Sequence, residues 1–315
     1  EKKKFKTSLY KSLICARPTE ALFEETAKIG IQGLETRVLD VTVPEARVFR
    51  NTADKYGVRV HSLMQGGMFN SADEAAREKA IETCTNAIKV ASAYGQDTVL
   101  CVPARIQDIG PKPWDFHIEF DPGTCHVTRV VEGDNTPYKE YIRQQNEATD
   151  MVFKYVERLI PVAAYEGITF CLENVWNNLW VCPKLIAAVI DHFDCRWIKA
   201  YYDLGNHVKY YRVEDGLKTL GAKRIAKLHI KDFIVDRQMP RGGQFVPIGR
   251  GDINWISIRD TLEEIGFSGW VTVEDVGFYS NAEFSQILQA FFDGKLTKDY
   301  ALSVRGGEYP PKKKK

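Results

Sequence analysis

Residues 226–252 read AKLHIKDFIVDRQMPRGGQFVPIGRGD and carry the most informative pattern in the chain. An apolar run has His229 near its end and is followed by a loop rich in glycine. Three more apolar runs carry a carboxylate at the same place: ITFCLEN has Glu173, KAYYDLGN has Asp203 and WVTVEDVG has Glu274. Helix-like sequence separates these runs. The pattern therefore indicates parallel strands whose C-terminal ends meet, as they do in a barrel active site.

The same alternation of short apolar runs and amphipathic segments covers residues 6–296. Eight strands are expected, each followed by a helix, at residues 5–14, 33–40, 58–67, 97–104, 168–175, 197–206, 225–232 and 269–277. Strict alternation requires right-handed crossovers and a parallel sheet, and eight units close into a barrel. We predict an α/β fold, a (β/α)8 TIM barrel, as a single domain over residues 1–315 with 297–315 as a C-terminal tail. An open doubly wound sheet is the alternative, but SLICARP stands where that fold has GxGxxG.

Residues 105–137 interrupt this alternation after the fourth strand. They contain several prolines and glycines and little apolar periodicity. Connections of this length without secondary structure are uncommon and often functional. We therefore expect a long loop over the barrel mouth, in which Trp114 and His117, together with Trp176, form an apolar wall or lid. Ordinary loop packing is the alternative for these three residues.

Composition and charge restrict the partners. The 315 residues are 44% hydrophobic, which is enough for a substantial core, and 43 Lys and Arg against 42 Asp and Glu leave a formal charge of +1. No overall field would gather nucleic acid or an anionic membrane, and the lysine runs at both ends are typical of solvated tails. We expect a small-molecule partner, no nucleic acid and no membrane, and leave a homo-oligomer open.

The cysteines and the lack of long apolar runs give information on the cellular compartment of the protein. Seven cysteines without a CxxC pair favour a reducing compartment. No apolar run reaches the roughly 18 residues that span a bilayer, and no signal-like segment is present. We expect a cytoplasmic protein, although the chain begins at Glu1 rather than Met, so a removed leader stays open.

Each strand-end residue taken singly has a structural explanation. Asp203 or Asp232 can cap a turn, and His229 can be a satisfied core histidine. Glu173 can pair with a lysine such as Lys231. Four such groups on separate strands need a joint explanation, because three negative charges at one barrel mouth repel strongly unless a cation lies among them. Three carboxylates and an imidazole suit one divalent cation, Mn²⁺, Mg²⁺, Co²⁺ or Zn²⁺.

Such a site predicts a type of chemistry. Four protein ligands leave two positions of an octahedral shell, which adjacent carbonyl and hydroxyl oxygens of a sugar can fill. The metal then acts as a Lewis acid that acidifies the C–H bond between those oxygens. A carboxylate on either side of that carbon can remove the proton and return it.

Several motifs resemble those of one family, the xylose-isomerase-like sugar isomerases and epimerases. They are LEN at 172–174, YDLGN at 202–206, HIKD at 229–232, GRGD at 249–252 and VTVED at 271–275, and the resemblance covers nearly the whole chain. It implies a (β/α)8 barrel with one divalent cation held by Glu173, Asp203, His229 and Glu274. In the ketose 3-epimerases of this family the two glutamates also exchange the substrate proton from opposite faces, and these roles fall on Glu173 and Glu274.

The chain departs from those epimerases at two places. They have a histidine three residues after the metal-binding aspartate, where Asn206 stands here and His207 follows. They have an arginine six residues past the metal-binding histidine, where Val235 stands and Arg237 lies two further on. Asn206, His207 and Arg237 remain candidate substrate-binding residues. The HIKD form, with Lys231, is more similar to the inosose dehydratases.

Other residues are lesser candidates. Glu35 and His61 end the second and third expected strands and can hold substrate hydroxyls, with loop hydrogen bonding as the alternative. Lys231 is a candidate catalytic residue that stabilises an enolate oxygen or helps to expel hydroxide, with an ion pair to Asp203 or Glu173 as the alternative. The glycines at 242–243 and 249–251 can cradle a phosphate or simply turn the chain.

We predict a divalent-metal-dependent sugar or keto-sugar isomerase or epimerase that abstracts a proton next to a carbonyl. The alternative is a lyase, dehydratase or hydratase with the same enolate, which Lys231 and Asn206 favour. An endonuclease-IV-like DNA-repair enzyme shares the barrel but needs three zinc ions and many strand-end histidines, and the chain has six histidines in all. A non-catalytic sugar-binding barrel is the last alternative.

Overall fold

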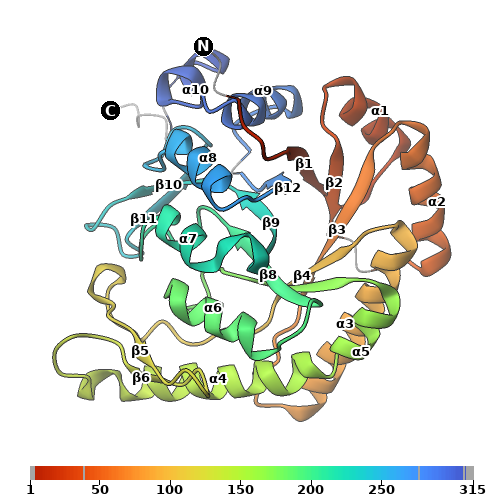
Figure 1. Cartoon of the computed structure of the whole chain (residues 1–315). Coiled ribbons are helices and arrows are strands. Elements are labelled where there is room, and N and C mark those ends of the chain that lie inside the picture. Colours follow the sequence, from red (N-terminus) through yellow and green to blue (C-terminus); the bar gives the residue numbers. More distant parts are fainter. Residues whose placement is uncertain (1–3, 38–39, 276, 308, 310–315) are drawn as a thin grey trace, which may run out of the picture.

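The centre of the molecule is a closed barrel of eight parallel strands (Figure 1). The computed structural model describes residues 4–37, 40–275, 277–307 and 309. Around the barrel the strands follow the order β1, β12, β9, β8, β7, β4, β3, β2. Their bounds are β1 (Leu9–Cys15), β2 (Gly33–Thr36), β3 (Arg59–Gly66), β4 (Thr98–Val102), β7 (Thr169–Glu173), β8 (Ile198–Asp203), β9 (Ile225–Ile230) and β12 (Gly269–Val273). The predicted single-domain TIM barrel is confirmed.

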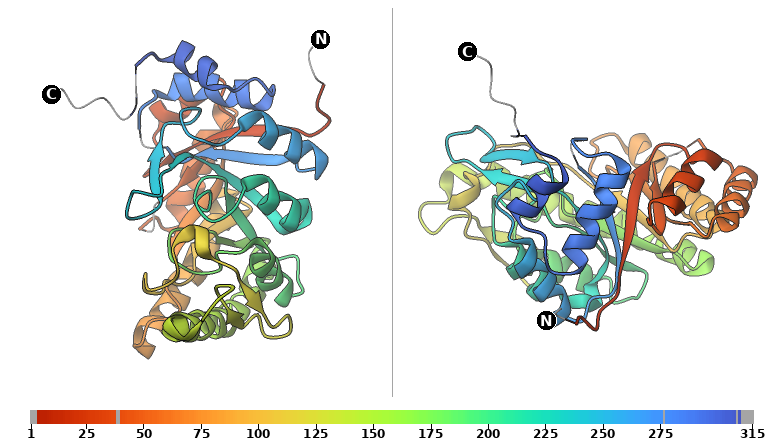
Figure 2. Two further views of the ribbon diagram at one scale, coloured as in Figure 1. Left: turned by 90° about the vertical axis from the view of Figure 1, so that its left-hand side faces the viewer. Right: turned by 90° about the horizontal axis from the view of Figure 1, so that it is seen from above.

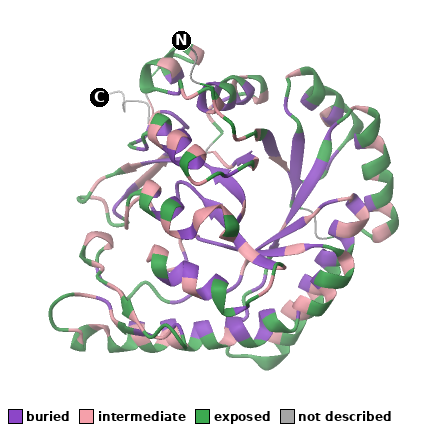
Figure 3. Ribbon diagram, in the orientation of Figure 1, coloured by how far each residue is buried: buried purple, intermediate pink, exposed green. Residues whose placement is uncertain are grey.

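Helices follow the strands along the chain and surround the barrel, each with part of its surface buried (Figures 1 and 3). They are α1 (Glu20–Lys28), α2 (Val43–Lys55), α3 (Glu74–Tyr94), α4 (Lys139–Glu157), α5 (Ile160–Glu166), α6 (Pro183–His192), α7 (Val213–Arg224), α8 (Trp255–Glu264) and α9 (Asn281–Phe292). Capping residues fix their ends: Thr19 accepts a hydrogen bond from the Leu22 amide, and Thr42 and Glu45 form a capping box. Helices α4 and α5 are separate, and Pro161 lies in the first turn of α5, where a proline is tolerated.

The barrel closes between its first and last strands. β1 runs parallel to β12, with Leu9 beside Gly269. Just before β1, the backbone amides of Lys6 and Thr7 donate to the carboxylate of Glu263 on α8, at 2.7 and 3.0 Å. The start of the barrel is therefore tied both to its last strand and to the helix before that strand.

The interior of the barrel is polar over part of its depth. TIM barrels usually fill this space with layers of branched apolar side chains. Here His61 Nε2 lies 2.6 Å from the hydroxyl of Ser12, and the ammonium of Lys227 lies 3.0 Å from His61 Nδ1. All three side chains are buried, and they come from β3, β1 and β9. Hydrogen bonds therefore join the strands from inside as well as along the sheet.

Two segments that we expected to be loops contain short strands. Residues 105–137 include the 3₁₀ turns η1 (Pro113–Asp115) and η2 (Thr136–Tyr138) and a hairpin of β5 (Glu119–Phe120) and β6 (Val127–Arg129). The glycine-rich segment after β9 forms a second hairpin, β10 (Asp232–Val235) with β11 (Gly243–Val246). Both hairpins lie on the same side of the barrel, and β6 packs on α4 (Figures 1 and 2). The excursion is thus a folded insertion.

The segment after α9 also departs from expectation. Residues 297–315 were expected to be a tail, but they begin with helix α10 (Lys298–Val304). Thr297 caps this helix by accepting a hydrogen bond from the Tyr300 amide, and Ala301 is fully buried.

Among all described residues, no helix is both long and apolar enough to cross a membrane.

Candidate metal centre

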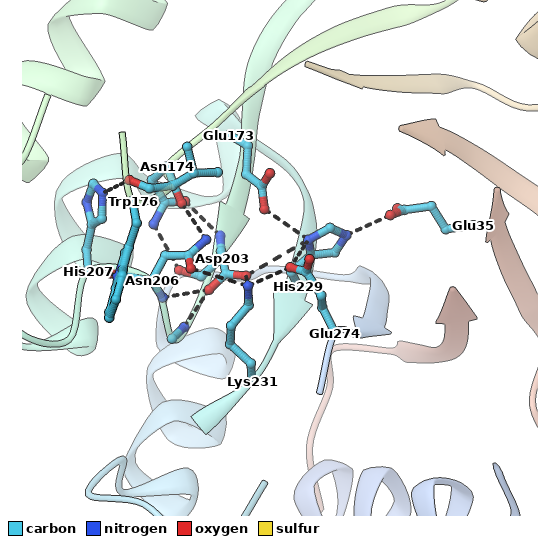
Figure 4. Close-up of polar contacts among 12 residues, drawn as sticks. Glu35, Glu173, Asn174, Trp176, Asp203, Asn206, His207, His229, Lys231 and Glu274 are labelled. Carbon is cyan, nitrogen blue, oxygen red and sulfur yellow. Dashed lines mark hydrogen bonds and ion pairs between the residues drawn. The ribbon is translucent and has the colours of Figure 1, made fainter. Parts of the chain in front are cut away.

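Four side chains meet at the C-terminal ends of four neighbouring strands. Glu173 ends β7, Asp203 ends β8, His229 lies one residue before the end of β9, and Glu274 directly follows β12. One oxygen or nitrogen atom of each lies within 4.8 Å of those of the other three (Figure 4). The sequence predicted this convergence, because parallel strands bring their C-terminal ends to one mouth of the barrel.

The spacing of these atoms fits a single metal ion. His229 Nδ1 lies 3.1 Å from Glu173 Oε1, 3.3 Å from Glu274 Oε2 and 3.9 Å from Asp203 Oδ2. Two ligands about 2.1 Å from one octahedral ion are about 3.0 Å apart at right angles and about 4.2 Å apart when opposite. Three carboxylates with one imidazole suit Mn²⁺, Mg²⁺, Co²⁺ or Zn²⁺. The four residues form a candidate metal site.

Hydrogen bonds hold Asp203 in position and leave one of its oxygens for a cation. Oδ1 accepts from the amides of Gly205 and Asn206, at 2.8 and 2.7 Å. Oδ2 is buried and accepts no hydrogen bond from the described residues, and it lies 3.2 Å from the ammonium of Lys231. Asn174 clamps the backbone of Asp203, donating to its carbonyl and accepting from its amide. Asn174 was not among the predicted site residues, although the LEN motif contains it.

Lys231 lies against the same carboxylates. Its Nζ is 2.6 Å from Glu274 Oε2 and 3.2 Å from Asp203 Oδ2 (Figure 4). Burial alone would lower the pKa of Lys231, but these two carboxylates hold it above its usual value. The ion pair with Asp203 that we considered as an alternative is therefore present. The lysine offsets part of the negative charge that we had expected a metal ion alone to balance.

The cluster moves the pKa values of its members in opposite directions. Burial raises the pKa of Glu173 to about 7, against the opposing effect of His229. Burial also disfavours the charged form of Glu274, but His229 and Lys231 hold its pKa well below the usual range. Burial would lower the pKa of His229, but the surrounding glutamates hold it well above the usual value. Such divergent shifts are typical of functional sites.

Glu35 lies one residue before the end of β2 and is buried against His229. It has no exposed surface, and its Oε1 is 2.7 Å from His229 Nε2 (Figure 4). Its other oxygen accepts a hydrogen bond from the hydroxyl of Tyr201, a residue that sequence reasoning missed because only its place two residues before Asp203 marks it. We expected Glu35 to hold substrate hydroxyls, but both of its oxygens are engaged by protein groups.

His61 also lies inside the barrel. Its side chain is fully buried, its ring stacks on Trp270 at 4.1 Å, and it contacts Lys227 two residues before His229 on β9. We expected it at the strand end, but β3 continues to Gly66. His61 is therefore one layer below the cluster, away from a substrate at the mouth.

Asn206 and Trp176 form a wall beside Asp203. Asn206 Oδ1 accepts from Lys231 at 3.2 Å, and its carbonyl accepts from Trp176 Nε1 at 2.7 Å (Figure 4). The Trp176 ring packs against Phe245 of β11, with ring centroids 4.7 Å apart. Trp176 is partly exposed, and the ammonium of Lys209 lies 3.8 Å from the centre of its ring.

His207 turns away from the cluster. Its Nδ1 lies 2.9 Å from the hydroxyl of Tyr211, and its Nε2 lies 3.2 Å from the carbonyl of Val175. The side chain is buried. The structure thus places His207 in a packing role, and it does not bring this residue to the four metal-site side chains.

Trp114 and Arg237 meet on another surface. The Arg237 guanidinium lies 5.3 Å from the centre of the Trp114 ring. Both line a groove of about 620 Å³ between the 208–214 segment, the β10–β11 hairpin and the start of α8. None of the four cluster residues lines this groove, so its size alone does not make it the reactive site.

His117 lies on the surface of the insertion. Its side chain is about half exposed, with ring nitrogens 3.5 Å from a Glu119 oxygen and 3.8 Å from a Glu132 oxygen. The structure does not bring it to the cluster. The expected wall of three aromatic residues is therefore divided, because only Trp176 lies next to the metal-site residues.

A second cavity opens beside Glu274. It has a volume of about 340 Å³ and is lined also by Ile14, Arg37 and Asn281. Arg37 Nη2 lies 3.6 Å from Glu274 Oε1. Arg37 was not predicted, since nothing in the sequence distinguishes it from other surface arginines.

The glycines of the GRG segment serve a carboxylate of the protein itself. The amides of Gly249 and Gly251 donate to Asp232 Oδ2 at 2.9 and 3.0 Å, and Trp255 Nε1 donates to the same atom at 2.9 Å. A Cβ atom on Gly251 would lie 2.0 Å from Asp232 Oδ1. These N–H groups are already satisfied, so they do not form the phosphate cradle that we considered. Asp232 has the capping role instead.

Comparison with known proteins identifies the family of the chain. Residues 23–287 match the family model described as "Xylose isomerase-like TIM barrel", and the chain belongs to that family. It is 27% identical over 209 residues to "Putative L-ribulose-5-phosphate 3-epimerase SgbU" of Escherichia coli strain K12, an alignment that covers 65% of this chain and 61% of that relative. The chain therefore spans less than two thirds of the length of that relative.

Two solved structures share the fold. One is D-psicose 3-epimerase with D-tagatose from Clostridium cellulolyticum H10, with a TM-score of 0.62 at 15% identity over 94% of this chain and 96% of that chain. The other is the IolI protein with a bound zinc atom, with a TM-score of 0.64 at 18% identity over 94% of this chain and 97% of that chain. At these identities the likeness shows the barrel fold alone. The type of reaction has to be inferred from the residues of the site.

Proposed function

We propose that the protein is a divalent-metal-dependent isomerase or epimerase of a sugar or keto-sugar, and that it moves a proton at a carbon next to a carbonyl. The observation that carries the proposal is the convergence of Glu173, Asp203, His229 and Glu274 on one point at the barrel mouth. The names of its relatives, sugar 3-epimerases among them, favour the same reaction class. A small sugar is the proposed partner, in place of nucleic acid.

The two glutamates are the proposed acid and base. They come from β7 and from the residue after β12, the outermost of the four neighbouring strands, and approach His229 from different sides (Figure 4). A divalent cation held there would supply Lewis acidity to two neighbouring substrate oxygens. Glu173 or Glu274 then takes the proton from the carbon between them. Return by the other glutamate inverts that carbon. Return to the neighbouring carbon, with the hydroxyl proton passing from one substrate oxygen to the other, isomerises the sugar.

Elimination or hydration remains the second candidate, and Lys231 favours it. Its ammonium lies 2.6 Å from one proposed base and 3.2 Å from Asp203, so a charged proton donor stands at the reacting centre. A lysine in that place can protonate a leaving hydroxide. The same proton abstraction would then end in a lyase, dehydratase or hydratase.

The other two alternatives have less support. An endonuclease-IV-like site needs several histidines at the mouth, but His61 is buried below the cluster, and His117 and His126 pair with surface carboxylates. Only one group suited to a metal occurs in the described part of the chain. A purely sugar-binding barrel would not need two carboxylates beside a Lewis acid.

Solvent exchange tests the proposal. The protein is incubated with a divalent cation in D₂O and a panel of ketoses that includes D-psicose, D-tagatose and L-ribulose 5-phosphate. Deuterium should enter one carbon of a substrate or product. An isomer of otherwise unchanged mass indicates an isomerase or epimerase, whereas loss or gain of water indicates the second candidate. Lys231→Ala should slow elimination and spare exchange if the lysine assists the leaving group.

A matched pair of variants identifies the base. Glu274→Gln should reduce exchange by about 10²-fold or more, the range expected for a general base, with a further loss from weaker metal binding. Glu264→Gln removes the same charge from the exposed face of α8 and should leave exchange unchanged. Turnover without deuterium uptake, together with a fully active Glu274→Gln enzyme, would refute proton transfer at this site.

A further inference from the structure

We propose that Glu35 is a positioning residue that fixes His229 in one tautomer, so that Nδ1 is its metal-binding atom. This inference rests on the metal site proposed above and adds to it a residue from the opposite side of the barrel. Glu35 lies on β2, which is not among the four strands that carry the proposed ligands.

The geometry excludes a role as a further ligand of the same ion. His229 Nδ1 faces Glu173, Glu274 and Asp203, at 3.1, 3.3 and 3.9 Å. Nε2 faces Glu35, whose Oε1 is 2.7 Å away (Figure 4). The two ring nitrogens point in different directions. An ion bound at Nδ1 is therefore out of reach of the Glu35 oxygen that is hydrogen-bonded at Nε2. Both His229 and Glu35 have 0% exposure, which also keeps Glu35 from substrate.

A tyrosine from the far wall holds Glu35 in place. The Tyr201 hydroxyl donates to Glu35 Oε2 and leaves Oε1 for the histidine. Tyr201 lies on β8, four strands away from β2 around the eight-stranded barrel in either direction. Tyr201 is also two residues before Asp203, so one strand carries both a proposed ligand and the support for another.

The hydrogen bond decides which nitrogen is free. A metal-binding imidazole is neutral and has one N–H group, which must find an acceptor when it is buried. Glu35 offers that acceptor at Nε2 only, so the lone pair is left on Nδ1, where the other carboxylates converge. Without Glu35 the N–H group would be buried and unpaired, and the ring could take the other tautomer. Loss of such an outer partner usually weakens metal binding about 10-fold to 100-fold.

Metal titration measures this effect without any substrate. Titrations with Mn²⁺ and with Zn²⁺ should give Kd values about 10-fold to 100-fold weaker for Glu35→Ala than for the unsubstituted protein. Glu35→Gln keeps an oxygen acceptor and should lose less, and Tyr201→Phe should lose less than Glu35→Ala. If Glu35→Ala does not fold, the Gln and Tyr201→Phe variants carry the test.

The control is Leu34→Ala. Leu34 is the neighbouring residue on β2, is equally buried, and belongs to the hydrophobic core. Its truncation should lower the melting temperature of the metal-free protein and leave the Kd for metal unchanged. A Glu35 variant that behaves like Leu34→Ala, with lower stability and an unchanged Kd, would overturn the proposal.

The tautomer can be observed directly. In the zinc-loaded protein, ¹⁵N NMR of the imidazoles should assign His229 a metal-bound Nδ1 and a slowly exchanging Nε2–H. That N–H signal should weaken or disappear in Glu35→Ala. A metal-bound Nε2 would overturn the inference while leaving the metal site in place. Failure of the unsubstituted protein to bind any metal would overturn the site itself, which is a distinguishable result.

Discussion

Three glutamates contact the ring of His229, and each has a different environment. Glu35 is sealed between His229 and Tyr201. Glu173 is almost fully buried, and burial raises its pKa to about 7. Glu274 is partly exposed and lies beside a lysine that holds its pKa well below the usual range. Glu35 therefore supports a proposed metal ligand, whereas Glu173 and Glu274 are candidate acids or bases.

His207 should make folding stability depend on pH. Burial lowers the pKa of His207 to about 4, whereas the unfolded chain should titrate near the ordinary value of about 6.5. The neutral His207 side chain makes its full contribution to the free energy of unfolding above about pH 6.5. As the pH falls from 6.5 to 4, the unfolded state takes up a proton that the folded state refuses, so stability falls by about 1.4 kcal/mol per pH unit and about 3 kcal/mol in total. Urea unfolding across this range measures the loss.

His207→Gln isolates this effect from other titrating groups. The variant lacks the imidazole, so the difference in unfolding free energy between the two proteins should shrink by about 3 kcal/mol from pH 7 to pH 4. A difference that stays constant with pH would mean that His207 is protonated in the folded protein too.

Sequence predicted the four metal-site residues because each lies at the end of an apolar run. The same argument was used for Glu35 and His61. Glu35 does lie one residue before the end of β2, but its oxygens bind His229 and Tyr201, and His61 lies deeper in the barrel. Side-chain position along a barrel depends on how the strands are staggered, and short sequence patterns do not contain that stagger. The third strand was expected at residues 58–67 and β3 covers Arg59–Gly66, so the strand itself was predicted, but His61 lies near its start rather than at its end.

The segment after β9 depends on one carboxylate. Asp232 accepts hydrogen bonds from two loop amides and the Trp255 indole, and Gly251 leaves no room for a side chain beside it. Asp232→Ala should destabilise the protein by about 3 kcal/mol or more, because several buried donors lose a charged acceptor. Urea unfolding at constant metal concentration checks this value.

Glycine substitutions give the matched comparison. Gly251→Ala would place a Cβ atom 2.0 Å from the Asp232 carboxylate and should be comparably damaging, whereas Gly133→Ala meets open space and should be nearly neutral. Equal stability of these two alanine variants would contradict the role that we assign to Asp232.

At the scale of elements, periodicity predicted all eight barrel strands and the helices between them. The short strands β5, β6, β10 and β11 were not predicted, since two to four residues carry too little periodicity to distinguish from a loop. The expectation that residues 105–137 lie over the barrel mouth stays a prediction. Helix α10 was missed because seven residues give only one buried position.

For the whole molecule, bound metal should raise the melting temperature. The candidate ligands come together only in the folded barrel, so a cation that binds there stabilises the folded state by mass action, about 2.7 kcal/mol at 100 times its Kd. Thermal unfolding with Mn²⁺, Mg²⁺, Co²⁺ or Zn²⁺, each against a chelated sample, tests this.

Asp203→Asn should abolish most of that increase, because an uncharged amide replaces one of the three carboxylates of the candidate site. No increase with any of the four cations in the unsubstituted protein would contradict the metal site.

The pairing of β1 with β12 has a consequence for the order of events during synthesis. The two strands come from opposite ends of the barrel sequence, and contacts between such distant segments form slowly. Glu274 directly follows β12, so the last strand to leave the ribosome carries the fourth ligand. A nascent chain that ends before that residue has three ligands and an open sheet. We therefore expect the complete four-residue site to form only when the barrel closes.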